Sequence, residues 1–130
     1  MREPIIVEMA GYYFQIIDGE KRWRACKKIG LTEETAKKDH TILMGTAKYS
    51  DIAKGQAMME EDSFAKAIID KDTEKILGFH IIGPNAPELL QEVVNTMESG
   101  GAISNIISGI HIHPALSELI QQTLANLEKV

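Results

Sequence analysis

At 130 residues the chain has the length of a single domain, with room for a hydrophobic core but not for two nucleotide-binding domains as well. Hydrophobic residues make up 44% and charged residues 25%, an ordinary globular composition, and no apolar run is long enough to span a bilayer. The net charge of −5 argues against a general nucleic-acid surface, and we expect the densest basic stretch, residues 21–28, to be a solvated face.

The N-terminus and the cysteine content indicate the compartment and limit the chemistry. The first residues lack both an apolar segment of signal length and a small-residue cleavage pattern, so we expect a cytoplasmic chain with no membrane or nucleic-acid partner. A single cysteine, Cys26, excludes an internal disulfide, a CxxC redox pair and a thiolate-rich zinc site within this sequence.

The first half of the chain favours strands with one short helix. Residues 5–17 are typical of a strand pair with a turn near Ala10 and Gly11. A short helix is expected to begin within residues 31–34 with Thr32 as its cap, and a further strand or two within residues 41–50.

Residues 63–83 predict an antiparallel hairpin, because two β-rich runs flank a polar connection over residues 70–75. In the first run Phe64 and Ile68 share a face with Lys66. In the second run Leu77, Phe79 and Ile81 alternate with the residues between them. One face of each strand is therefore expected to meet a layer of helices.

The last part of the chain predicts helices. A helix is expected from about Ala86 to Ser99, with Asn85 as cap and Glu88 in the capping-box position. A short helical turn is expected over residues 103–108, and a final helix from Pro114 to about Glu128. Without regular βαβ alternation, this order predicts an α+β fold, an antiparallel sheet packed against helices.

Between the last two helices the sequence reads HIHPALSE, residues 111–118. A hydrogen bond from the Glu118 carboxylate to His113 would fix the ring tautomer and make the other nitrogen a base suited to a thiol. Alternatively, extended backbone would place His111 and His113 on one face as metal ligands, joined by His40, His80 or a glutamate. A third reading has His111 packing and His113 capping the helix.

Several segments resemble the C-terminal interface domain of the pyridine-nucleotide disulfide oxidoreductases, the group of dihydrolipoamide dehydrogenase, mercuric reductase and glutathione reductase. The similarity spans about Ile29 to Ala125. The matching segments are IGLTEETA (29–36), DKDTEKILGFHIIGPNA (70–86), PELLQE (87–92) and HIHPALSE (111–118), which resembles the family's HxHPxxSE signature.

The resemblance implies that His113 is the catalytic acid/base residue, that Glu118 orients it and that His111 supports the motif. It also implies a homodimer in which His113 and Pro114 direct their backbone toward the flavin of the partner subunit, with a cis His113–Pro114 peptide. FAD and NAD(P) are the cofactors of the parent family. The sequence itself shows neither a Gly-rich dinucleotide fingerprint nor a redox cysteine pair, so we expect no activity from the isolated chain and no cofactor of its own.

These features predict two parts: residues 1–25, an N-terminal segment with strands whose role stays open, and residues 26–130, the dimerisation domain. Three functions stay open. The chain is an interface domain; or it completes an enzyme whose FAD- and NAD-binding domains lie on a separate polypeptide; or it is a stand-alone binding or regulatory module that kept the fold without the chemistry. No metal site is assigned, and His40 and His80 are expected to be surface or packing residues.

Overall fold

In a computed structural model the chain divides into two compact units, Met1–Gly30 and Leu31–Val130. The structure describes the backbone of residues 6–10 and 13–18, and residues 31–129 in full. In the first unit, strands β1 (Ile6–Ala10) and β2 (Tyr13–Asp18) pair antiparallel, which confirms the predicted strand pair. The predicted turn at Gly11, Cys26 and the basic stretch 21–28 lie outside the described residues, and the domain boundary after residue 25 stays a prediction.

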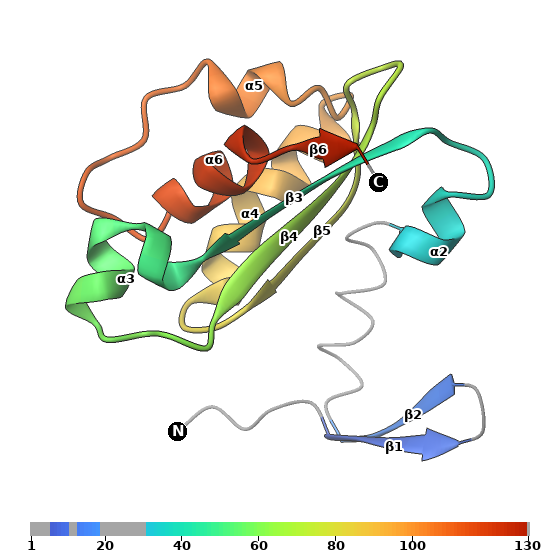
Figure 1. Cartoon of the computed structure of the whole chain (residues 1–130), viewed down its shortest axis with the longest axis horizontal. Coiled ribbons are helices and arrows are strands. Elements are labelled where there is room, and N and C mark those ends of the chain that lie inside the picture. The colour runs from blue at the N-terminus through green and yellow to red at the C-terminus, as the bar shows by residue number, and fades with distance from the viewer. Residues whose placement is uncertain (1–5, 11–12, 19–30, 130) are drawn as a thin grey trace. The chain divides into compact units, whose positions relative to one another are not determined.

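The second unit is an α+β domain, as predicted. Its sheet has the antiparallel order β5-β4-β3-β6, and Figure 1 shows helix α2 lying apart from α4, α5 and α6. The strands are β3 (Ile42–Lys48), β4 (Phe64–Asp70), β5 (Ile76–Ile82) and β6 (Glu128–Lys129). The helices are α2 (Glu33–Ala36), the 3-10 turn η1 (Tyr49–Asp51), α3 (Ala53–Ala57), α4 (Ala86–Glu98), α5 (Ser104–Ile107) and α6 (Glu118–Ala125). None of the described helices is long and apolar enough to cross a membrane.

One face of the sheet carries the main core. Side chains from β3, β4 and β5 pack there against α4, α5 and α6, and burial of their apolar surface is the chief stabilising term. Its largest fully buried apolar side chains are Tyr49, Phe79, Ile69, Ile106, Leu119, Ile120 and Val93. The Tyr49 hydroxyl donates to the carbonyl of Pro84 at 2.8 Å, so this buried polar group is satisfied.

The predicted face of Leu77 is wrong, because a β-bulge interrupts the alternation of strand β5. Ile68 pairs with Gly78 but Ile69 pairs with Ile76, so Leu77 is the extra residue and the alternation reverses there. Leu77 therefore packs with Ile68 in the smaller cluster under α2, whereas Phe79 belongs to the main core. A side chain at Gly78 would collide with the carbonyl oxygen of Leu31, whose N–H donates to Leu77 at 2.6 Å.

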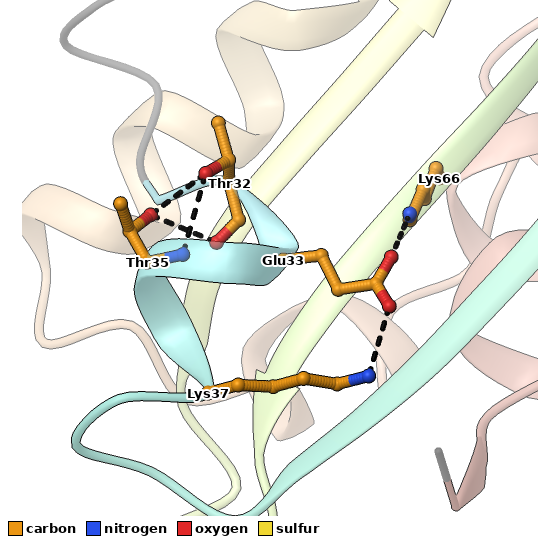
Figure 2. A network of polar contacts seen from close by, with 5 residues as sticks. All are labelled: Thr32, Glu33, Thr35, Lys37 and Lys66. Carbon is orange, nitrogen blue, oxygen red and sulfur yellow. Dashed lines mark hydrogen bonds and ion pairs between the residues drawn. The ribbon is translucent and has the colours of Figure 1, made fainter. Parts of the chain in front are cut away.

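Helix α2 covers the smaller cluster, on the face of the sheet opposite the main core, and is attached there by a polar network. Thr32 caps the helix as predicted, because its hydroxyl accepts the N–H of Thr35. Figure 2 shows Glu33 between Lys37, the residue that follows the helix, and Lys66 of strand β4. The Glu33 carboxylate oxygens lie 3.0 Å from Nζ of Lys37 and 2.7 Å from Nζ of Lys66. The hydrogen bond from Lys66, followed by that from Lys37, lowers the pKa of Glu33.

Helix α4 begins at Ala86 as predicted, but its predicted side-chain cap is absent, and the predicted start of the last helix is wrong. Asn85 adopts a left-handed backbone (φ 58°) and its side chain caps nothing, and Pro87 in the first turn has no N–H to offer a cap. The last helix begins at Glu118, not at Pro114. The N–H of Ala115 donates instead to the Glu118 carboxylate, which closes a turn ahead of the helix.

Candidate functional site

The predicted pair of His113 and Glu118 is in contact. Nδ1 of His113 lies 2.8 Å from Oε1 of Glu118, and the second carboxylate oxygen accepts the N–H of Ala115 at 3.0 Å. His113 precedes the helix in an irregular segment and its peptide bond to Pro114 is cis, while Glu118 is the first residue of α6. The short interval Pro114–Ser117 thus folds back so that the carboxylate reaches the ring.

The geometry sets the tautomer of His113. An ionised carboxylate only accepts hydrogen bonds, so in the neutral ring Nδ1 holds the proton and Nε2 keeps its lone pair. The hydrogen bonds from Ala115 and then from His113 lower the pKa of Glu118, which keeps this carboxylate ionised at neutral pH. The His113 side chain is 69% exposed, whereas that of Glu118 is 21% exposed. The imidazole ring is therefore accessible from solvent, and its carboxylate partner is more sheltered.

His111 occupies a different environment. Its Nε2 lies 3.0 Å from Oε1 of Glu92 on helix α4, and its side chain is only 7% exposed. In the neutral ring the carboxylate contact places the proton on Nε2, which leaves the lone pair on Nδ1. Nδ1 is buried and has no hydrogen-bond partner among the described residues, so this nitrogen is not presented to a substrate.

The alternative of a metal site gains no support. His111 and His113 turn to carboxylates on two different helices, and His80 is exposed on β5. Within residues 6–10, 13–18 and 31–129 no group of three or more histidine, cysteine, aspartate or glutamate residues is placed to hold a metal ion.

His40 has a partner that sequence reasoning missed. Its Nδ1 lies 2.6 Å from Oδ2 of Asp70, while Oδ1 of Asp70 accepts the N–H groups of Asp72 and Thr73. Although desolvation acts to raise it, these backbone hydrogen bonds and the bond to His40 together lower the pKa of Asp70. The Asp-x-Asp-Thr turn sequence was the available signal, and the pair fastens the β4–β5 turn to the loop before β3.

Apolar side chains are exposed next to the pair. Ile110 is 97% exposed and Ile112 is 73% exposed, so the side chains on either side of buried His111 both point to solvent. Ile107, at the end of α5, is also exposed. A cluster of exposed isoleucines within six residues marks a surface that a partner is expected to cover.

Comparison with known proteins identifies the family of this chain. The family model described as "Pyridine nucleotide-disulphide oxidoreductase, dimerisation domain" matches residues 26–124. Dihydrolipoyl dehydrogenase 3 of Haloarcula marismortui is 34% identical over 99 residues, covering 75% of this chain and 21% of that protein. The mitochondrial dihydrolipoyl dehydrogenase of Caenorhabditis elegans is 36% identical over 101 residues, covering 76% of this chain and 20% of that protein.

A solved structure shows the same fold. The HOCl-induced flavoprotein disulfide reductase RclA from Escherichia coli superposes with a TM-score of 0.69 at 27% identity, covering 74% of this chain and 22% of that chain.

A second family model, "ParB N-terminal domain", matches residues 1–42. The chain spans about a fifth of the length of the curated relatives it matches. Over most of its length, the chain belongs to the dimerisation-domain family of the pyridine nucleotide-disulphide oxidoreductases.

Proposed function

We propose that this chain acts as the interface domain of a dihydrolipoyl-dehydrogenase-like flavin disulfide oxidoreductase, in which His113 is the acid/base residue and Glu118 orients it. The observation that carries the proposal is the 2.8 Å contact between the two side chains, with the His113 ring 69% exposed. The similarity to dihydrolipoyl dehydrogenases supports the substrate class, a dithiol or disulfide.

The chemistry asked of the pair is proton transfer. Nε2 of His113 would accept the proton of a substrate thiol, whose ordinary pKa is about 8.5, and the resulting thiolate is the form that attacks a disulfide. Glu118 would stabilise the imidazolium that forms, since its carboxylate already accepts the hydrogen bond from Nδ1–H. In the reverse direction the imidazolium would return the proton to a departing thiolate.

The chain's residues fit a flavin held by another subunit or polypeptide. The described part of the chain contains no parallel βαβ unit to bind a dinucleotide, whereas Ile110 and Ile112 are exposed beside His113 and Pro114. The backbone of His113 and Pro114 would lie toward the flavin of the partner. FAD, with NAD(P) and a redox disulfide outside these residues, would supply the electron transfer.

A homodimer is the assembly that this proposal requires. Burying Ile107, Ile110 and Ile112 against a second copy would remove apolar surface from water, which favours association. Sedimentation should show wild-type chain self-associating and the Ile110→Ser, Ile112→Ser double variant shifted toward monomer. A wild-type chain that stays monomeric at high concentration would count against this assembly.

Complementation tests the catalytic role. A polypeptide holding the FAD and NAD domains with the redox cysteines would be mixed with this chain and assayed for dihydrolipoamide oxidation. Since general acid-base residues contribute roughly 10²–10⁴-fold, His113→Gln should lose activity on that order, and Glu118→Gln should lose less. His80→Gln, at an exposed histidine on β5, is the control and should match wild type. Activity that survives His113→Gln would refute the role of His113.

A second candidate function is favoured by the match of residues 1–42 to the ParB N-terminal domain. The chain would then be a binding or regulatory module that joins this N-terminal segment to a reductase-type dimerisation fold, with the His113–Glu118 pair only structural. In that case His113→Ala would lower thermal stability, while binding and activity in the mixed assay would not change.

A further inference from the structure

The segment that presents His113 is held by its side chains. Residues 110–114 belong to no helix or strand, and within the part of the chain that the structure describes no backbone-to-backbone hydrogen bond involves them. Two side-chain contacts fasten the segment instead. His111 is bound to Glu92 on α4, and His113 is bound to Glu118 on α6.

From this arrangement we infer that Glu92 and His111 act as positioning residues for His113. The inference rests on the proposed acid/base role of His113. Glu92 would fix one end of a short bridge between α4 and α6, so that the His113 ring meets the Glu118 carboxylate in a single orientation.

The environment of His111 supports a positioning role over simple packing. Its ring is 7% exposed, yet its Nδ1 has no partner among the described residues, and a buried polar atom without a partner is unfavourable. A leucine would fill a similar space without that cost. The histidine is explained by the directional bond from Nε2 to Glu92, which an apolar side chain cannot make.

Position along the chain makes this bond effective. His111 and His113 are separated only by Ile112, whose 73% exposed side chain contributes little packing. Without the bond to Glu92, the remaining anchor near the ring would be the single contact to Glu118, and rotation about the free backbone would let the ring leave the carboxylate. The expected consequence is a mixture of His113 tautomers in place of one.

The test reads the ring nitrogens of both histidines by ¹⁵N NMR on the full 130-residue chain, at a pH where the rings are neutral. The wild-type chain should show opposite tautomers, with the proton on Nδ1 of His113 and on Nε2 of His111. In Glu92→Leu, and equally in His111→Leu, the two His113 nitrogen signals should converge toward the average of mixed tautomers. The double variant should show no further change, because both substitutions remove one contact.

Two variants are controls. Glu92→Gln keeps an acceptor oxygen for His111 Nε2–H and should restore the wild-type His113 signals. Glu98→Leu removes an exposed glutamate from the same helix and should leave them unchanged. Backbone amide spectra would confirm that each variant is folded.

Folded Glu92→Leu or His111→Leu chains with wild-type His113 signals would overturn the inference. So would a wild-type chain in which the two histidines share one tautomer, a result that needs no variant to fold. Neither measurement uses a flavoprotein or a substrate. Failure here therefore leaves the complementation assay for His113 unaffected.

Discussion

Replacing Gly45 by alanine tests how helix α6, which carries Glu118, is seated on the sheet. A β carbon on Gly45 of strand β3 would lie 2.1 Å from the carbonyl oxygen of Thr123 and 3.2 Å from Cδ2 of Leu127. Real β carbons essentially never lie within 3.0 Å of such an atom. The helix would therefore have to retreat by roughly 1 Å from a closely packed core, which cannot absorb the shift locally.

The expected loss of stability is large for one methyl group. Overpacking a core typically costs about 1–3 kcal/mol, and Gly45→Ala should fall near the upper end because the obstacle is backbone, not a flexible side chain. Reduced freedom of the unfolded chain returns only about 0.4–1 kcal/mol. For a domain of this size each kcal/mol lowers the melting temperature by roughly 4–8 °C, so a fall on the order of 10–20 °C is expected.

Thermal and urea denaturation followed by circular dichroism would measure this loss, with Gly109→Ala as the matched control. Apart from the adjacent residues, the nearest atom to a β carbon at Gly109 is the carbonyl oxygen of Ile106 at 3.3 Å, which needs to move by only a few tenths of an ångström, so this variant should stay much closer to wild type. If Gly45→Ala were as stable as Gly109→Ala, helix α6 could not lie against β3 as described. The placement of Glu118 beside His113, which depends on the position of this helix, would then be refuted as well.

Three smaller perturbations follow from single contacts. Tyr49→Phe removes the hydrogen bond to Pro84 and should cost about 1 kcal/mol in urea unfolding. Burial, followed by the charge of Glu60, raises the pKa of Tyr49 from 10.0 to about 12, so stability should fall as pH rises above 10.0, and less so in the variant. The pKa of Glu118 is lowered from 4.5, so its contribution is present above pH 4.5 and is lost as pH falls through the folded value; Glu118→Gln should flatten that acid limb in pH-dependent melting. Thr32→Ala removes a long cap bond of 3.4 Å and should cost roughly 0.5 kcal/mol by thermal denaturation.

The sheet was predictable where the sequence alternates cleanly. The hairpin of β4 and β5 was predicted from its β-rich runs and polar turn, and Phe79 lies in the core as its periodicity indicates. Leu77 was assigned to the wrong face because a bulge inserts one residue into the strand. No local sequence pattern indicates this bulge. The cause lies elsewhere in the chain, where the backbone of Leu31 runs against Gly78 and bonds to Leu77.

Helices were predictable when their apolar stripe was long. Helix α4 has such a stripe and was found, whereas α3, the segment AKGQA, has no repeat of apolar residues and was missed. The start of α6 was misplaced because Pro114 is a common first residue of a helix. That preference was overridden by the Glu118 carboxylate, which accepts a hydrogen bond from the Ala115 N–H. At a helix start this N–H would have been left without a partner in the helix.

The two histidines of HIHP show what sequence spacing alone does not decide. In one of the readings, extended backbone places both rings on one face as metal ligands, and in another Glu118 pairs with His113 alone; spacing does not decide between them. The difference comes from carboxylates on separate helices: Glu92 accepts a hydrogen bond from Nε2–H of His111, and Glu118 accepts one from Nδ1–H of His113. The lone pair of His111 is consequently buried and that of His113 belongs to an exposed ring. Because a base must reach its substrate, only the second histidine has both the tautomer and the access that proton transfer requires.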